Sequence, residues 1–406
     1  MRQTRRQLLA TMGLGGAAVL VPQAVRAQKK YDPGASDSEI KIGNTCAYSG
    51  PIASAGQQIG RCEAAFFRMI NAHGGINGRK ITFISYDDGY SPPKTVEQTR
   101  RLVESDGVLL IFAGTGTPTQ TAVHKYLNQM KVPQLFVATG ASKWGDPQHY
   151  PFTMGFFPNY QAEGRIYASY ILAHYPGARI GVLYQNDDFG KDYLNGLTHG
   201  LGAKAGSMIV MAAAYDAADP TVDSQIVRLK SAGVDLFFNV AIPKIAAQAI
   251  RKTAEMGWKP VHILCGVVAS VALTLKPAGL EHCKGILTSI WGKDVTDPIW
   301  QDDAGYREWL AFMNKWNPAG DKTDAANVAA YTVSQMMVQV LKQCGSDLTR
   351  ENVMRQAANL HRLALPMLLP GITINTSPTD FFPIKGERMA RFDGAHWVLF
   401  GPVLTA

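Results

Sequence analysis

Residues 108–120 read Val-Leu-Leu-Ile-Phe-Ala-Gly-Thr-Gly-Thr-Pro-Thr-Gln, an apolar run followed directly by glycines, threonines and a proline. A short apolar run that ends at a turn signal predicts a buried strand, and the Thr-Pro-Thr that follows favours the start of a helix. A strand, a glycine-rich loop and a helix together make one βα unit of a parallel sheet. The free N–H groups at such a helix start can hold a carboxylate beyond the sheet's carboxyl end, although the same residues also suit an ordinary helix start without a ligand.

The same alternation extends along the chain on both sides of this unit. Apolar runs and helical stripes predict strands at 40–46, 81–86, 108–113 and 132–138, with helices at 58–73, 95–103 and 119–130. After a break at Gly155-Phe156-Phe157-Pro158, strands are predicted at 179–184, 208–215, 234–240 and 261–265, with helices at 161–174, 190–200, 221–232 and 244–256. Later helices are predicted at 306–316, 325–344 and 349–358, the last capped by Thr349, and short strand-like pieces at 372–399. The fold class is therefore α/β, with two doubly wound parallel sheets.

The first 27 residues have the features of an export signal. A basic head with Arg2, Arg5 and Arg6 precedes a weakly apolar stretch over 8–22, and Val25 and Ala27 fit a signal peptidase site. Residues 4–9, Thr-Arg-Arg-Gln-Leu-Leu, resemble the twin-arginine motif. The alternative, a membrane anchor, would need a longer apolar run.

Charge and chemistry exclude several classes of function. Residues 1–27 carry four arginines and no acid, so their removal lowers the formal net charge from +8 to +4. With lysines and arginines scattered, no nucleic-acid partner is indicated. The sequence has no HExxH, nucleophile elbow or Walker loop, so we expect no catalytic residue, metal site or cofactor. The acid pairs Asp87-Asp88 and Asp187-Asp188 could hold a metal or do acid/base work, but no further ligand lies near in sequence, so they are interpreted as loop caps and solvated acids.

The five cysteines give no metal-binding pattern. They are Cys46, Cys62, Cys265, Cys283 and Cys344, and none has CxxC spacing. An odd number leaves at least one thiol unpaired. A bridge between Cys265 and Cys283 and a set of buried free thiols both remain open.

Several segments, in their order and spacing, resemble one family over nearly the whole chain after residue 27. They are Glu39-Ile40-Lys41-Ile42-Gly43, Ser49-Gly50-Pro51, residues 71–81, Tyr86-Asp87-Asp88, residues 114–120 and 136–142, Asn186-Asp187-Asp188-Phe189-Gly190 and Phe237-Phe238-Asn239-Val240. The family is that of the leucine/isoleucine/valine-binding proteins, the branched-chain amino acid receptors of ABC importers, which have the type I periplasmic-binding fold.

This resemblance implies two Rossmann-like lobes joined by three hinge crossovers and closing on a ligand. The crossovers are expected near Phe157, Ile286 and Ile372. Lobe 1 then comprises residues 28–157 plus 287–371, and lobe 2 comprises 158–286 plus 372–406, after the signal peptide 1–27.

The resemblance also implies a set of ligand-binding residues. In the first lobe, Gly116, Thr117, Thr139 and Ala141 are expected to hold a ligand carboxylate. Receptors for amino acids in this family hold the ligand ammonium with a Tyr and a Glu in the second lobe, but counting from Gly257 and Gly279 places Ile242 and Val267 there. Because neither can pair with a charge, an α-amino acid is disfavoured. The remaining expected contacts are Tyr48 and Phe189.

These features predict a non-catalytic periplasmic receptor that passes a small, largely apolar carboxylate, including aromatic acids, to an ABC permease and ATPase complex at the inner membrane. We expect it to be a monomer. The alternatives are a receptor for a branched-chain amino acid, an amide or urea, and a ligand-sensing regulator with the same fold.

Overall fold

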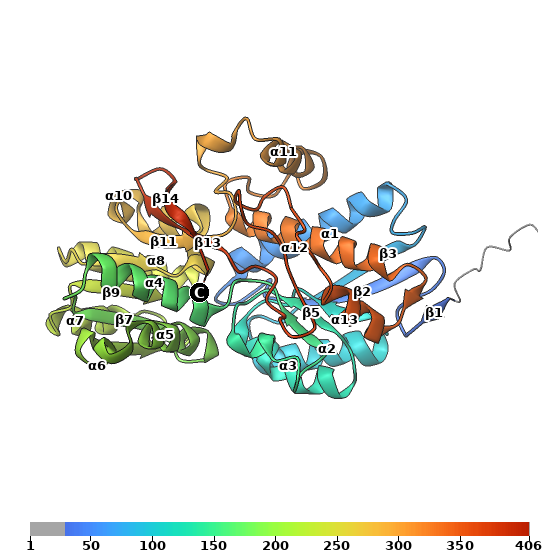
Figure 1. Ribbon diagram of the computed structural model, residues 1–406, viewed down its shortest axis with the longest axis horizontal. Coiled ribbons are helices and arrows are strands. Elements are labelled where there is room, and N and C mark those ends of the chain that lie inside the picture. The colour runs from blue at the N-terminus through green and yellow to red at the C-terminus, as the bar shows by residue number, and fades with distance from the viewer. Residues whose placement is uncertain (1–28, 406) are drawn as a thin grey trace, which may run out of the picture.

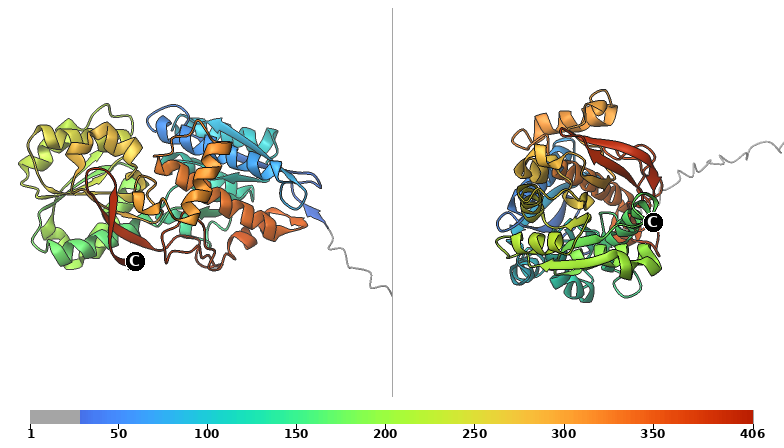
Figure 2. Two further views of the ribbon diagram at one scale, coloured as in Figure 1. Left: turned by 90° about the horizontal axis from the view of Figure 1, so that it is seen from above. Right: turned by 90° about the vertical axis from the view of Figure 1, so that its left-hand side faces the viewer.

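The computed structural model describes residues 29–405, so the predicted signal peptide lies outside the described residues. The chain forms two α/β lobes lying side by side, each around its own sheet (Figure 1). Figure 2 shows the lobe drawn in green and yellow beside the one drawn in blue and orange. The predicted fold class is confirmed. No helix within residues 29–405 has both the length and the apolar character that crossing a membrane requires.

The first lobe is built on a parallel five-stranded sheet. In spatial order its strands are β3 (Lys80–Asp87), β2 (Glu39–Cys46), β4 (Leu110–Phe112), β5 (Gln134–Val137) and β6 (Thr153–Gly155). Its helices are α1 (Ala53–Ala72), α2 (Pro92–Arg100), α3 (Thr117–Gln129), α11 (Ala304–Trp316), α12 (Ala325–Cys344) and α13 (Arg350–Ala357). Strand β4 shows why both faces are covered: Leu110 and Phe112 enter the core beneath α1 and α12, while Ile111 enters the core beneath α2 and α3.

The second lobe is built on a mixed seven-stranded sheet. In spatial order its strands are β14 (Trp397–Leu404), β13 (Glu387–Phe392), β11 (Leu287–Ile290), β10 (Val261–Leu264), β9 (Leu236–Val240), β7 (Ile180–Gln185) and β8 (Ile209–Tyr215). Its helices are α4 (Tyr160–His174), α5 (Asp188–Leu201), α6 (Ala205–Met208), α7 (Asp223–Ser231), α8 (Pro243–Glu255), α9 (Lys276–Ala278) and α10 (Leu280–Cys283). A small parallel pair, β1 (Lys30–Tyr31) with β12 (Asp347–Leu348), lies apart from both sheets.

The second sheet departs from the prediction of purely parallel strands. Strand β13 runs antiparallel to both β11 and β14. A tight turn at 393–396 joins β13 to β14 along the same sheet edge.

The crossovers also lie later than predicted. Strand β11 belongs to the second sheet, so the chain leaves this lobe after Ile290 and not near Ile286. Ile372, Ile374 and Phe381 pack in the core of the first lobe, so the chain returns just before β13. We propose lobe boundaries after residues 159, 290 and 386.

All five cysteines are free and buried within the described residues. The Cys265–Cys283 bridge left open by the sequence is therefore not present, and four of the thiols pack in the cores of the lobes as small apolar groups, namely Cys62, Cys265, Cys283 and Cys344.

Candidate functional site

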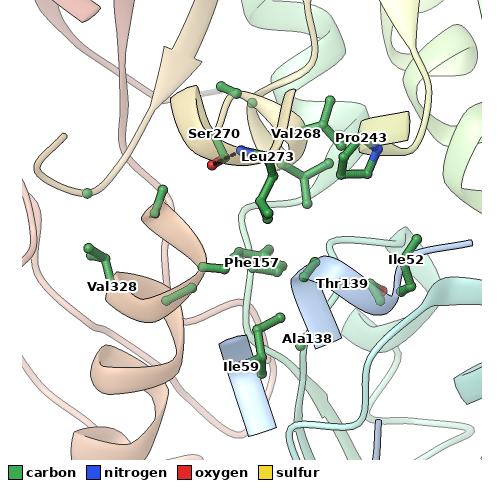
Figure 3. A pocket seen from close by; sticks show the side chains of 18 of the residues that line it. Ile52, Ile59, Ala138, Thr139, Phe157, Pro243, Val268, Ser270, Leu273 and Val328 are labelled. Atoms are coloured by element: carbon green, nitrogen blue, oxygen red, sulfur yellow. Dashed lines mark hydrogen bonds between the residues drawn. The ribbon is translucent and has the colours of Figure 1, made fainter. Parts of the chain in front are cut away.

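A cavity of about 200 Å³ lies between the two lobes, and most of its wall is apolar. The first lobe contributes side chains from the start of α1, from Phe157 and from the first two turns of α12. The second lobe contributes Pro243 and the segment 266–273, and Trp291 and Trp397 also line the cavity. Figure 3 shows side chains from these segments converging around Phe157.

The N-terminus of α3 forms one polar end of this cavity. Gly116 is the N-cap residue with φ +94°, and a Cβ there would lie 2.6 Å from both Thr119 Oγ1 and a ring carbon of Tyr90. Only glycine fits such a close approach. The first-turn amides of a helix have no acceptor within the helix and carry its positive pole, so this end favours an anion.

Thr139 adds a hydroxyl donor to the cavity wall. Its Oγ1 accepts hydrogen bonds from Trp144 Nε1 at 2.5 Å and from the amide of Ala141 at 3.5 Å. Both accepting positions of this oxygen are thereby used, and no described residue accepts the hydroxyl proton. The proton is available to a ligand oxygen.

Tyr90 adds a second hydroxyl donor, and this hydroxyl also takes part in a hydrogen bond between the lobes. It lies in the loop after β3 with φ +60°, and its amide donates to Asp88 Oδ1 at 2.9 Å. Its hydroxyl accepts from Gln185 Nε2 at 3.1 Å. Burial raises the pKa of Tyr90, so the phenol keeps its proton and can donate it.

The Tyr90 bond continues into the second lobe. Gln185 Oε1 accepts from the Tyr215 hydroxyl at 3.1 Å, and that hydroxyl accepts from the amide of Ile242 at 2.9 Å. Ile242 is the N-cap residue of α8 and lines the cavity. One hydrogen-bonded chain therefore fixes Tyr90 relative to the wall of the second lobe.

Six of the eight predicted ligand-binding residues line the cavity: Gly116, Thr117, Thr139, Phe189, Ile242 and Val267. Tyr48 and Ala141 are not among the lining residues. The Tyr48 hydroxyl shares a 2.7 Å hydrogen bond with Ser85 Oγ, and Ala141 is fully buried behind Thr139. Ligand contact by any of the eight stays a prediction.

Other lining residues were not predicted. Tyr90 follows an acid pair at a strand end, a position that could have indicated it, since the carboxyl ends of parallel strands border the ligand crevice. No such signal marked Tyr160, Trp291, Ser270 or the start of α12. For α12, the sequence pattern of an apolar helix face is the same whether that face packs in a core or contacts a ligand.

The acids near the cavity are engaged by the protein. Asp187 caps α5 by accepting from the amides of Phe189 and Gly190, and Asp87 and Asp88 accept from loop amides and hydroxyls, as their interpretation as caps predicted. Asp88 is fully buried, so its interpretation as a solvated acid is wrong. Glu163 lies behind the wall at Gly266, whose amide donates to it at 2.6 Å, while Tyr167 and Tyr193 donate to its two oxygens. No group of acids, histidines or cysteines in residues 29–405 is arranged to hold a metal ion.

Three further contacts hold the lobes together around the cavity. Lys143 forms a 2.5 Å ion pair with Asp188, and Ser142 donates to Asp192 through its amide and its hydroxyl. At another part of the rim, Ser270 donates to Asp324 at 3.0 Å. The lobes are therefore in a closed arrangement.

Comparison with known proteins fits this architecture. A Leu/Ile/Val-binding protein homolog of Brucella suis is 23% identical over 325 residues, which cover 78% of this chain and 82% of the relative. A branched-chain amino acid ABC transporter protein of Thermus thermophilus, solved with bound valine, has a TM-score of 0.82 at 15% identity, covering 92% of this chain and 98% of that one. An ABC transporter solute-binding protein of R. palustris, solved with benzoate, has a TM-score of 0.75 at 20% identity, covering 91% and 98%. The family model of the periplasmic binding proteins matches residues 39–395, and the chain belongs to that family.

Proposed function

We propose that this protein is the periplasmic substrate-binding component of an ABC importer and that it captures a small, largely apolar carboxylate between its lobes. The observation that carries the proposal is the excess of donors at one end of an otherwise apolar cavity. The hydroxyls of Tyr90 and Thr139 already accept hydrogen bonds from Gln185 and Trp144, and each keeps a proton that no described residue accepts, so each can donate toward the cavity. Together with the amides at the start of α3, they suit a ligand group that only accepts, which is what a carboxylate is.

A branched-chain amino acid is the second candidate, favoured by the valine-bound relative. Its ammonium group, bonded to the carbon that carries the carboxylate, would need an acceptor close to the start of α3. The second-lobe residues that line the cavity, among them Phe189, Ile242 and Val267, are apolar. The carboxylates of Asp187 and Glu163 are occupied by protein donors. An ammonium left without a counter-charge costs several kcal/mol, which favours the simple carboxylate.

The partner and the compartment follow from the same proposal. The relatives solved with valine and with benzoate are described as ABC transporter proteins, and the first 27 residues have the pattern of an export signal. An importer's receptor delivers its ligand to a permease and ATPase at the inner membrane, and opening of the lobes releases it there.

A thermal-shift screen of the protein without residues 1–27 tests the proposal. A ligand that binds only the native state raises the melting temperature. The panel contains benzoates, cinnamates, fatty acids of short and medium length, and leucine, isoleucine and valine. Shifts with apolar acids and none with the amino acids support the proposal, and the reverse pattern contradicts it.

A further inference from the structure

The cavity has a second end, remote from the start of α3. In Figure 3, Val328 and Ser270 lie on the opposite side of Phe157 from Thr139 and Ile52. A Cβ at Gly292 would lie 3.6 Å from Val328, so the crossover after β11 also borders this end. The buried polar residues that line it are Ser270, Lys293 and Asp294.

Each of these polar groups is already engaged by the protein. Ser270 Oγ donates to Asp324 at 3.0 Å and accepts from the amide of Leu273 at 3.1 Å, which uses its proton and one accepting position. This leaves Ser270 no proton to give to a ligand.

The two charged residues are also engaged by the protein. Lys293 Nζ contacts Asp303 Oδ1 at 2.5 Å and the carbonyl of Pro366 at 2.7 Å, and it lies 5.4 Å from the centre of the Trp300 ring. The carboxylate of Asp294 accepts from the amide and hydroxyl of Thr296 and from the amide of Trp397. These interactions hold both side chains toward the surrounding protein.

We infer that the far end of the cavity accepts only an apolar group, so the site selects monocarboxylates whose tail carries no second polar group. The inference rests on the proposed function, which orients the ligand with its carboxylate at α3. A hydroxyl or carboxyl on the tail would be buried among Val328, Trp397 and polar groups whose protons are directed at protein acceptors. Its oxygen would lose water without gaining a donor, although a hydroxyl proton could still reach the accepting position left on Ser270 Oγ.

Matched ligand pairs test this inference with the unaltered protein. The pairs are octanoate with 8-hydroxyoctanoate, and 3-phenylpropanoate with 3-(4-hydroxyphenyl)propanoate. Dissociation constants can be read from tryptophan fluorescence, because Trp291 and Trp397 line the cavity. For the pair whose parent acid binds more tightly, we expect the hydroxylated acid to bind about 10- to 100-fold more weakly.

The outcomes separate this inference from the proposed function. Equal or tighter binding of the hydroxylated acid contradicts the inference but leaves the receptor for apolar acids intact. Failure of every parent acid to bind, with binding of leucine or valine, contradicts the proposed function itself.

A variant tests whether the preference for the unhydroxylated acid arises at the far end of the cavity. Val328→Thr places a hydroxyl on the cavity wall, and the matched control Val333→Thr places one in the core on the same helix, away from the cavity. We expect Val328→Thr to reduce the preference for the parent acid at least threefold, since the new hydroxyl can form a hydrogen bond with the ligand's hydroxyl. An unchanged preference in a Val328→Thr protein that still binds the parent acid would contradict the inference.

Discussion

The hydroxyl of Tyr90, in the first lobe, accepts a hydrogen bond from the side-chain amide of Gln185, in the second lobe, over 3.1 Å. Tyr90 lines the cavity and Gln185 is almost fully buried beside it. The bond can exist only when the lobes are closed, and it directs the remaining phenol proton away from Gln185. Closure of the lobes and orientation of a donor on the cavity wall are therefore coupled through one pair of side chains.

Replacing Tyr90 by Phe removes both the cross-lobe bond and the donor. A hydrogen bond to a charged group contributes about 1.5–3 kcal/mol, so we expect the dissociation constant for an apolar acid to rise about 10- to 100-fold. The control is Tyr126→Phe, because the Tyr126 hydroxyl bonds to Glu104 outside the cavity. Titration calorimetry measures both, and unchanged affinity in Tyr90→Phe would refute a role for this hydroxyl.

Placing a carboxylate at Val267 tests the register of the second lobe. Val267 lines the cavity where receptors for amino acids are expected to carry an acid. At pH 8 we expect Val267→Glu to weaken binding of an apolar acid at least about tenfold, because it sets like charge against the ligand. Val267→Gln has the same shape without the charge and should bind more tightly than Val267→Glu. Equal affinities of the two variants would mean that residue 267 does not face the ligand's carboxylate.

Asp324, the N-cap residue of α12, gives a pH dependence of stability. Burial, and the nearby Asp321, raise its pKa to about 6, above the ordinary value near 3.9. Its Oδ1 accepts from Ser270 across the lobes, while Oδ2 has no partner among the described residues. The folded state binds the Asp324 proton more tightly than the unfolded state does. Protonation of Asp324 therefore stabilises the fold fully below about pH 4, and this stabilisation is lost as pH rises through about 6.

We therefore expect Asp324→Asn to be more stable than the wild type at pH 8, by on the order of 2 kcal/mol, with little difference at pH 4. Asparagine keeps the cap and the acceptor for Ser270. Urea unfolding at pH 4, 6 and 8 measures this, with Glu255→Gln on the surface of α8 as the control. A variant less stable than the wild type at pH 8 would show that the charged form of Asp324 is favoured in the folded state.

The cysteines provide a chemical test of the cores. All five are buried and free, and burial raises the pKa of Cys283 and of Cys344 to about 12. Since the thiolate is the reactive form, we expect no reaction with Ellman's reagent in the folded protein. Unfolding without a reductant should release all five thiols. A yield of three would indicate a disulfide.

Much of the fold could be predicted from local patterns. The helix predicted at 325–344 has those bounds in the structure, and Thr349 caps the next helix by accepting from the amide of Asn352. Strong apolar periodicity and cap chemistry are local, so one sequence is enough to read them. Strands β6 and β11 were missed because Thr153–Gly155 and Leu287–Ile290 are short and rich in polar residues.

The site was predictable only where it follows strand ends. Gly116, Thr117 and Thr139 follow β4 and β5, and all three line the cavity. Val328 and Trp397 reach the same cavity from distant segments through packing of the lobes, which no local pattern encodes. The donor role of Tyr90 depends on Gln185, 95 residues away in sequence.

Binding of 3-phenylpropanoate and phenylalanine, compared by titration calorimetry, isolates the ammonium group, because the two ligands differ only there. The cavity has donors for the carboxylate and no free acid for the ammonium, so 3-phenylpropanoate should bind at least about 100-fold more tightly. The same comparison of 4-methylpentanoate with leucine repeats the test with an aliphatic tail. Tighter binding of the amino acid in either pair would contradict the assignment of an apolar carboxylate as ligand.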